Sequence, residues 1–294
     1  MEKINELKKY EPIYVIGHKK PDVDTIFSSY LLSNILNYFN IESYPCIISD
    51  GYVINKYNKS IINDYLEFNP KVIDVNNIKK YNFVIVDHNE PIQSIGEGSN
   101  IVFGMDHHKN SGKLNNILFS DLCSNCLFIY DYFKDIYPFN EHEKTLVMVA
   151  TLTDTLFFKT DRYKEKDKKI VEELNIRLDN LELLNKYFVE TDLSMGIDKY
   201  IEKSDRDFSF QNITFSSSVI YVKQQNQEKM HEYKNLIFNK DWNHLGIWHD
   251  LEKNKTYVYF KVNNNFKEIV YDFIASRAAT VMPDVNTCLE ELYK

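Results

Sequence analysis

The chain has 294 residues, of which 44% are hydrophobic and 14% aromatic, and it carries a formal net charge of -8. This length exceeds what one hydrophobic core usually supports, so it predicts two domains, and the apolar content excludes a disordered chain. The negative charge argues against long nucleic acids as partners, and no apolar run approaches the roughly 18 to 20 residues of a membrane span, so we expect a cytoplasmic protein without a membrane partner.

Strand and helix patterns alternate through the first half of the chain. The strand segments are short apolar runs, whereas the helical segments repeat apolar residues at helical spacing. The expected strands are Ile13–Ile16, Tyr44–Ile48, Lys71–Val75, Phe83–Val86 and Ile101–Met105, and the expected helices are Thr25–Tyr38, Cys126–Phe133 and Glu143–Leu152. This alternation predicts an α/β fold with a doubly wound, mostly parallel sheet.

The second half of the chain has a different pattern. A polar stretch from Arg162 to Lys186 is expected to be helical, and Phe188–Lys203 is the candidate connection between domains. Beyond it, the expected elements are a strand pair over Phe208–Val222, a helix over Gln224–Phe238, and strands over Leu245–Trp248 and Thr256–Val262. We therefore predict a first domain at 1–190 and a smaller α+β domain at 191–294.

Glycines and cysteines limit the chemistry. With eight glycines, the chain contains neither G-x-G-x-x-G nor G-x-x-x-x-G-K-[ST], which excludes the two common glycine-rich phosphate loops. Four cysteines are too few for a disulfide framework. Cys123 and Cys126 form a C-x-x-C pair, but no second pair completes a zinc site, so two small residues at the start of a helix are the favoured interpretation.

Ionisable side chains follow the predicted strands and end one predicted helix. Residues 17–25 read GHKKPDVDT, 87–89 read DHN, 106–108 read DHH and 153–155 read TDT. The carboxyl ends of parallel strands meet at one edge of a sheet, so we expect these segments to converge. Any single Asp there is accounted for as a helix cap, but the combination of imidazole and carboxylate groups predicts a site for an ion of the Mn²⁺, Co²⁺ or Zn²⁺ class.

These motifs, in this order and spacing, resemble the DHH phosphoesterase superfamily. The closest resemblance is to the family II, manganese-dependent inorganic pyrophosphatases, which carry a C-terminal DHHA2-type domain. It is strong over Ile13–Lys159 and weak beyond, until Ser276-Arg277 and Val281-Met282-Pro283. The resemblance implies a hydrolase of phosphoanhydride bonds that converts inorganic pyrophosphate to two phosphates. It also implies two Mn²⁺ ions, with Co²⁺ or Mg²⁺ as alternatives, and a second domain that closes over the site; a homodimer is left open.

The resemblance also implies a role for each candidate residue. One ion would be held by His18, Asp22 and Asp87, and the other by Asp24, Asp87, His107 and Asp154. The residues taken as catalytic are His108, Asp24 and Asp87, with His108 facing the substrate as a proton or hydrogen-bond donor. His88 and Asp106 are expected to orient ligands.

Phosphate binding is expected to involve His108, Lys159 and Arg277, the last through its bidentate guanidinium. The chain departs from the family at Ala278 and Ala279, where the family has two lysines. Another family lysine aligns with Met195-Gly196, and the lysines at 199 and 203 are candidates to replace it.

The missing lysines keep two other interpretations open. The same metal centre would also suit a short-chain exopolyphosphatase or a nucleotide phosphoesterase, whose substrates are longer or less charged. A regulatory binding protein with decayed activity is a third possibility. The sequence alone does not determine the substrate, the metal preference, or the roles of His88 and of the cysteine pair.

Overall fold

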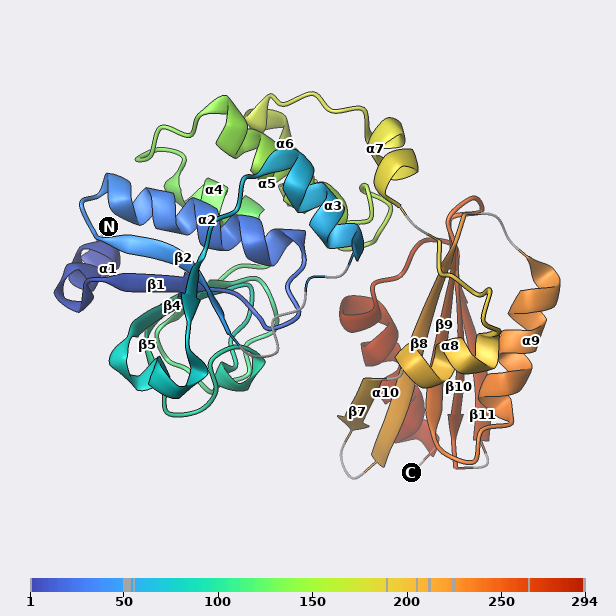
Figure 1. Ribbon diagram of the computed structural model, residues 1–294. Helices are drawn as coiled ribbons and strands as arrows, with labels where there is room; N and C mark the ends of the chain where they lie inside the picture. The colour runs from blue at the N-terminus through green and yellow to red at the C-terminus, as the bar shows by residue number, and fades with distance from the viewer. Residues whose placement is uncertain are drawn as a thin grey trace. The chain divides into compact units, whose positions relative to one another are not determined.

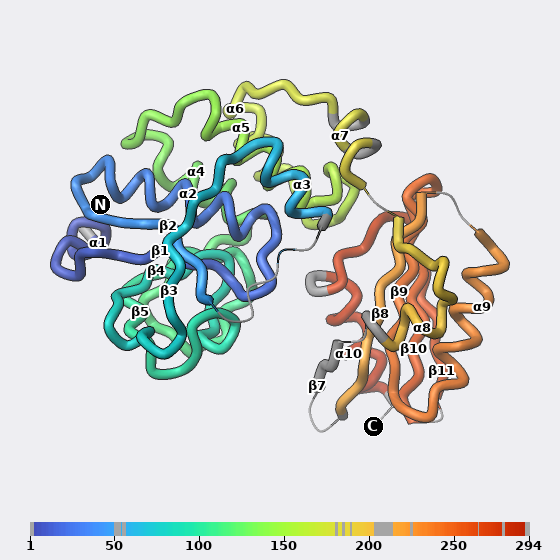
Figure 2. Tube along the Cα trace, in the orientation of Figure 1, coloured from blue at the N-terminus to red at the C-terminus, as the bar shows by residue number. Residues whose placement is uncertain are grey.

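The computed structural model describes residues 2–49, 54, 56–188, 190–204, 206–210, 213–223, 226–263 and 265–292. The chain forms two compact units. The first contains Met1–Phe158 and Tyr163–Tyr187, and the second contains Lys159–Arg162 and Phe188–Lys294 (Figures 1 and 2). The second unit thus takes a short segment from the middle of the first. The functional division into 1–190 and 191–294 stays a prediction.

Six parallel strands form the sheet of the first unit, in the order β3-β2-β1-β4-β5-β6. They are β1 (Ile13–Ile16), β2 (Ser43–Ile48), β3 (Lys71–Ile73), β4 (Asn82–Val86), β5 (Asn100–Asp106) and β6 (Ile117–Phe119). The order runs outward from β1 on one side and from β4 on the other, as in doubly wound sheets. The predicted α/β class is confirmed, and β6 is a strand that the sequence pattern did not predict.

The strand order reverses between β1 and β4. Ile16 pairs with Ile85, so the two strands end side by side. Open parallel sheets bind ligands outside the carboxyl ends of the strands at such a reversal. The loops that leave β1 and β4 begin with Gly17 and Asp87, which places both motif segments at this point.

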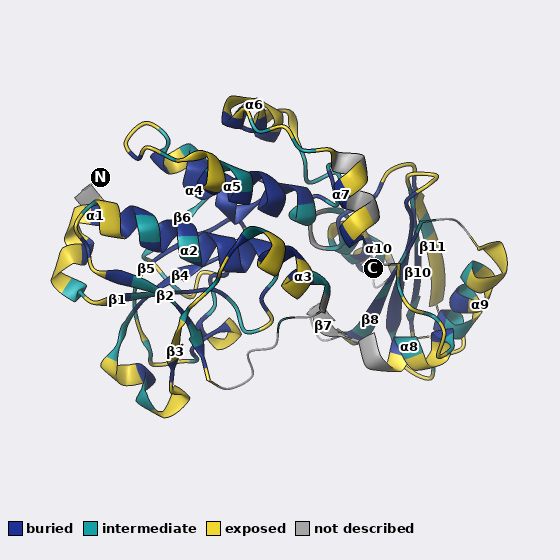
Figure 3. Ribbon diagram, turned by 45° about the horizontal axis from the view of Figure 1, so that its top comes forward, coloured by how far each residue is buried: buried dark blue, intermediate teal, exposed yellow. Residues whose placement is uncertain are grey.

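Helices α2, α4 and α5 cover one face of this sheet (Figures 1 and 3). The helices of the first unit are α1 (Glu2–Asn5), η1 (Glu6–Tyr10), α2 (Val23–Tyr38), α3 (Lys56–Tyr65), η2 (Val75–Lys80), η3 (Pro91–Gln93), α4 (Asn125–Phe133), α5 (Glu141–Asp154), α6 (Glu165–Leu174) and α7 (Asn180–Tyr187). Val15 and Val84 pack into the core under α2, whereas Ile16 and Ile85 belong to a smaller cluster on the opposite face. Burial on both faces explains why these strands read as continuous apolar runs.

The second unit is an α+β fold around a five-stranded mixed sheet, in the order β11-β10-β9-β8-β7, in which only the β8–β9 pair is parallel among the described strands. Its elements are α8 (Ile197–Ser204), β7 (Arg206–Phe210), β8 (Ile213–Val222), α9 (Gln227–Phe238), β9 (His244–Asp250), β10 (Lys255–Val262), β11 (Asn265–Tyr271), the π-helical turn η4 (Arg277–Val281) and α10 (Met282–Leu292). Helices α8 and α9 pack on one face, and α10 packs on the other (Figure 1).

Several elements differ from the sequence expectation. The polar stretch after Arg162 contains two helices, α6 and α7, and the helix predicted from Gln224 begins at Gln227, with Gln224 itself outside the described residues. Helices α3, α8 and α10 and strand β11 were not predicted. Within the described ranges, none of the helices combines the length and apolar character that a bilayer span requires.

Candidate metal centre

The loop between β1 and α2 carries the first candidate ligands. Asp22 is the N-cap of α2, and its carboxylate accepts a hydrogen bond from the backbone N–H of Thr25 at 3.0 Å. A Cβ on Gly17 would lie 2.0 Å from the Thr25 Cγ2 atom, so only glycine allows this close approach. His18, which follows Gly17, is held beside the Asp22 carboxylate by the tight turn.

Asp87 lies at the end of β4 in a left-handed backbone conformation, with φ at 61°. Its N–H donates to the carbonyl of Met105 on β5 at 3.1 Å, and its Oδ2 accepts a hydrogen bond from the Thr25 hydroxyl at 2.5 Å. Its Oδ1 is buried and accepts no hydrogen bond in the structure. Non-glycine residues seldom adopt this conformation, and those that do are concentrated at functional sites.

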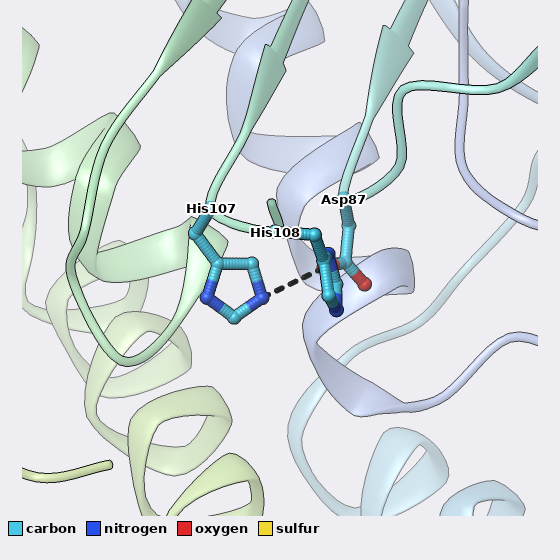
Figure 4. A group of neighbouring side chains, drawn as sticks. All are labelled: Asp87, His107 and His108. Carbon is cyan, nitrogen blue, oxygen red and sulfur yellow. Dashed lines mark ion pairs between the residues drawn. The ribbon is translucent and has the colours of Figure 1, made fainter. Parts of the chain in front are cut away.

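Two groups of potential ligands meet at Asp87. In the first group, His18 Nε2 lies 3.6 Å from Asp22 Oδ2 and 3.5 Å from Asp87 Oδ2. In the second, His107 Nε2 lies 3.1 Å from Asp87 Oδ1, as Figure 4 shows, and 3.7 and 3.8 Å from carboxylate oxygens of Asp154 and Asp24. The six side chains predicted as metal ligands are therefore brought together, although the sequence motifs span more than a hundred residues.

The tautomer of His107 suits a metal ligand. Its Nδ1 lies 3.0 Å from the backbone carbonyl of Leu122, and because a carbonyl only accepts hydrogen bonds, Nδ1 carries the proton. Nε2 is then the ring nitrogen that faces the carboxylates, and it becomes available to a metal ion once any proton on it is displaced. A backbone carbonyl that fixes a histidine in this way is a common feature around metal sites.

Asp24 is held by the N-terminus of α4. Its Oδ1 accepts hydrogen bonds from the Ser124 hydroxyl at 3.0 Å and the Cys126 N–H at 2.8 Å, and its Oδ2 accepts one from the Asn125 N–H at 2.6 Å. Backbone donors at a helix N-terminus stabilise a carboxylate and restrict its orientation. This support comes from residues about a hundred positions away, and the sequence analysis did not identify it.

The pKa values follow from the crowding of carboxylates and imidazoles. Burial by itself would lower the pKa of His18, but Asp22 and Asp87 outweigh it and raise this pKa to about 10. Burial opposes ionisation of Asp87, yet His107 and His18 hold its pKa well below the ordinary value. Burial, and then the Asp87 charge, raise the pKa of Asp24. Protons therefore balance the carboxylates here, and a divalent cation would displace them on binding.

The donor set fits a pair of divalent ions. Carboxylate oxygens and neutral imidazole nitrogens are suited to Mn²⁺ and related ions. The buried Asp87 Oδ1, with no hydrogen bond, is the kind of atom that coordination would satisfy. Asp87 also belongs to a third group with His107 and His108, so the assignment of each residue to one ion stays a prediction.

The second histidine of the DHH motif lies at the exposed edge of the cluster, with its Nδ1 3.7 Å from Asp87 Oδ1. His108 has a side chain that is 47% exposed, and its Nδ1 lies 2.9 Å from Asp106 Oδ1. The other Asp106 oxygen accepts a hydrogen bond from the Asn89 side chain at 2.5 Å. Asp106 therefore orients His108, the residue expected to face the substrate. Asn89 supports Asp106, a role that was not predicted from the sequence.

His88 does not contact the ligand cluster. Its ring nitrogens bond the Val86 carbonyl at 2.8 Å and the Ser94 hydroxyl at 2.7 Å. Both nitrogens are thus occupied, and burial lowers the pKa of this ring to about 4. His88 is a neutral structural residue that fixes the chain after β4, and the expectation that it orients a ligand is wrong in this respect.

The cysteine pair opens α4, as the simpler interpretation predicts. Cys126 lies in the first turn of the helix, and the Cys123 N–H donates to the Asp167 carboxylate at 2.9 Å. Both are buried free thiols, and among the described residues neither belongs to a group of side chains that could hold an ion.

Two of the predicted substrate residues lie in the second unit. Arg277 begins the turn η4, and Lys159 lies in the segment that the second unit takes from the first. The side chains of Ala278, Ala279 and Lys203 lie outside the described residues, and Lys199 lies on α8.

The first unit has a parallel sheet, with His and Asp side chains at the point where its strand order reverses. A family model matches the sequence of the same region. Residues 12–157 match the DHH family, N-terminal domain. This part of the chain belongs to the DHH family.

About half of the chain is similar in sequence to manganese-dependent inorganic pyrophosphatases. It is 29% identical over 173 residues to the enzyme of Methanothrix thermoacetophila, covering 55% of this chain and 53% of the relative. It is 30% identical over 177 residues to the enzyme of Methanocaldococcus jannaschii, covering 54% of each. The chain thus spans about half the length of these relatives in sequence.

A solved structure extends the likeness of the fold to both units. A Methanococcus jannaschii protein assigned to the family II inorganic pyrophosphatases aligns with a TM-score of 0.67 and 20% identity, over 94% of this chain and 98% of that one. At this identity the match shows the fold alone.

Proposed function

We propose that this protein is a two-metal phosphohydrolase of phosphoanhydride bonds, with inorganic pyrophosphate as substrate and Mn²⁺ as the resident ion. The observation that carries the proposal is the position of Asp87, whose two oxygens contact the His18 group and the His107 group separately. One carboxylate between two ligand groups is suited to a bridged metal pair. The names of the similar proteins support the choice of pyrophosphate and of manganese.

In this proposal the ligand residues set the geometry of the reaction. His18, Asp22 and Asp87 hold one ion, and Asp24, Asp87, His107 and Asp154 hold the other. When bound, such a pair lowers the pKa of water and neutralises phosphoryl oxygens. Asp87 is shared by both sets of ligands, and its position is fixed by the Thr25 hydroxyl and the backbone carbonyl of Met105.

The substrate residues supply the remaining charge. Asp106 accepts the Nδ1–H of His108, so in the protonated ring the exposed Nε2–H is left to donate to a phosphoryl or leaving-group oxygen. In this proposal Arg277 and Lys159, which both belong to the second unit, bind the distal phosphate. Phosphoryl transfer depends mainly on such positioning and neutralisation of oxygen charge.

Phosphate release tests the proposal. The Mn²⁺-loaded protein is assayed with pyrophosphate, tripolyphosphate and a dinucleotide in parallel. We expect turnover of pyrophosphate, abolished in Asp87→Ala and retained in Asp74→Ala, which removes the exposed N-cap carboxylate of η2 in the same unit. Full activity of Asp87→Ala would show that the site is wrongly assigned.

A short-chain exopolyphosphatase is the second candidate. The observation in its favour is Ala278-Ala279, because two lysines fewer weaken the binding of a compact, highly charged substrate. Turnover of tripolyphosphate without turnover of pyrophosphate would favour it. Inactivity on every substrate would favour a regulatory binding protein.

A further inference from the structure

The segment Lys159–Arg162 is built into the second unit by its backbone. Thr160 forms a parallel β-bridge with Ile274, and the Asp161 N–H donates to the Ile274 carbonyl at 3.3 Å. The segment follows Asp154 by only a few residues, and the connecting residues Leu156, Phe157 and Phe158 all have positive φ. The chain thus leaves the end of α5 through an unusual turn and then pairs with Ile274, which lies three residues before Arg277.

The Asp161 side chain bonds both ends of the turn that contains Arg277. Its Oδ1 accepts a hydrogen bond from the Ser276 N–H at 2.7 Å, and its Oδ2 accepts one from the Thr280 hydroxyl. The turn is closed on itself, because the Ser276 carbonyl accepts hydrogen bonds from the N–H groups of Thr280 and Val281, each at 3.0 Å. Arg277 is therefore enclosed between two residues that one carboxylate holds.

A second set of contacts supports the same turn from the sheet. The Thr256 hydroxyl on β10 donates to the Phe273 carbonyl at 3.0 Å and accepts from the Ala275 N–H at 2.9 Å. Because the one hydroxyl proton of Thr256 is donated to Phe273, His249 must be the donor in the 2.9 Å contact between its Nδ1 and this hydroxyl. The sheet thus fixes the approach to the turn, and Asp161 fixes the turn itself.

We propose that Asp161 is a positioning residue that holds the Ser276–Thr280 turn and so fixes Arg277 for phosphate binding. This inference rests on the proposed function, in which Arg277 binds the substrate. In this chain the two residues after Arg277 are alanines, so the turn carries one cation where the resembling family has three. A guanidinium that binds phosphate through two parallel hydrogen bonds depends strongly on its orientation, so the contribution of this turn to substrate binding depends on how Arg277 is held.

A double-mutant cycle tests the inference. We expect Asp161→Ala and Arg277→Ala each to raise the KM for pyrophosphate about 10-fold, with little change in kcat, because each removes charge-assisted binding of the substrate. In the Arg277→Ala background, Asp161→Ala should add less than about 2-fold, because a residue that acts through Arg277 has nothing left to position. Additive effects would overturn the inference.

Two further variants separate positioning from general support of the fold. Asp161→Asn keeps an acceptor for the Ser276 N–H and can donate its amide to the Thr280 oxygen, so it should restore KM to within about 3-fold of wild type. Asp192→Ala is the matched control, because Asp192 accepts a backbone N–H, from Ser194 at 2.9 Å, within the same unit. A KM change in Asp192→Ala equal to that in Asp161→Ala would contradict a specific role.

The inference can fail separately from the proposed function. If the wild type does not hydrolyse pyrophosphate, the same cycle is measured as the Kd for imidodiphosphate by calorimetry on the Mn²⁺-loaded protein. If the losses of affinity in Asp161→Ala and Arg277→Ala are not additive, Asp161 still positions Arg277, and only the proposed reaction is wrong. Unchanged affinity in both single variants, or no binding by the wild type, would reject the role of Asp161.

Discussion

At the scale of single residues, Asp87 shows how the site depends on groups outside the ligand set. Its positive φ costs on the order of 1 to 3 kcal/mol, which the surrounding contacts must overcome. The hydrogen bonds from its own N–H to Met105 and from the Thr25 hydroxyl to its Oδ2 hold it in place. Thr25 therefore acts on the site without being a ligand itself.

Replacing Thr25 with valine tests this support. Thr25→Val keeps the side-chain shape and removes the donor to Asp87 Oδ2, so we expect Mn²⁺ affinity to fall by about 10- to 100-fold. Metal titration followed by calorimetry measures the change. Thr151→Val is the matched control, since the buried Thr151 hydroxyl bonds only the Val147 carbonyl of its own helix in the described contacts. Equal losses in the two variants would argue against a specific role for Thr25.

His249 makes the stability of the second unit depend on pH. Burial, and then the charge of Arg277, lower the pKa of this ring to about 3, whereas an unfolded histidine titrates near 6.5. Between these values the unfolded state binds the additional proton, so stability is full above pH 6.5 and falls as the pH decreases. The loss from pH 7 to pH 5 is about 2 kcal/mol for this one group.

The measurement is urea unfolding at pH 7 and pH 5. His249→Asn keeps a donor for the Thr256 hydroxyl and removes the titrating ring, so the difference between the two pH values should shrink by about 2 kcal/mol. His231→Asn, at an exposed position of α9, should leave the difference as it is in the wild type. An unchanged difference in His249→Asn would rule out His249 as its source.

The ligand types were predictable from the sequence, but their supports were not. His18, Asp87 and His107 follow strands, and the geometry of a parallel sheet brings such positions together. The tautomer of His107 depends on Leu122 and the orientation of Asp24 on the N-terminus of α4, contacts that no local pattern encodes. His88 was misinterpreted because its neighbours in the sequence, not its surroundings in space, suggested its role.

At the scale of elements, the β1–α2 loop has little room for a larger side chain at Gly17. A Cβ on Gly17 would overlap Thr25, whose hydroxyl holds Asp87. Gly17→Ala should therefore destabilise the protein by about 1 to 3 kcal/mol and also weaken Mn²⁺ binding. Denaturant unfolding and metal titration measure the two effects.

Gly98→Ala provides the matched control for this loop. Gly98 has φ at 79° and no atom near its missing Cβ, so alanine there should cost about 1 kcal/mol of backbone strain and leave Mn²⁺ affinity unchanged. If Gly17→Ala behaved like Gly98→Ala, the close packing of the loop would have no effect on the site.

Apolar core elements were predicted well, whereas more polar or very short elements were missed. Strands β1 and β4 and helix α2 lie in the core and are rich in apolar residues. Helix α3 has the mostly polar sequence KYNKSIINDY, and β11 is a largely exposed edge strand, so neither has the high apolar content of a core element. The strand β6 has only three residues, which is too short to distinguish from a loop by pattern.

At the scale of the whole molecule, the candidate ligands all belong to the first unit. Mn²⁺ should therefore stabilise that unit, by about 2.7 kcal/mol at a free concentration of 100 times the Kd. Hydrogen exchange read by mass spectrometry should show protection of peptides around α2, α4 and β5, reversed by a chelator. Equal protection of α9 and β11 would show that the ions act through another part of the chain.

The exchange of a segment between the units was not predictable from the sequence. Lys159–Arg162 shows neither a change in composition nor a glycine that would indicate that the chain passes from one unit to the other there. Its place in the second unit comes from pairing with Ile274, more than a hundred residues later. A prediction that divides the chain at a single boundary assigns this segment to the first unit, whereas it packs in the second.

Electron paramagnetic resonance of the Mn²⁺-loaded protein tests the central claim most directly. Asp87 contacts both ligand groups, so two equivalents of Mn²⁺ should bind and give the spectrum of an exchange-coupled pair, which Asp87→Ala should abolish. A six-line signal of isolated Mn²⁺ at every loading, unchanged in Asp87→Ala, would contradict a metal pair bridged at this residue.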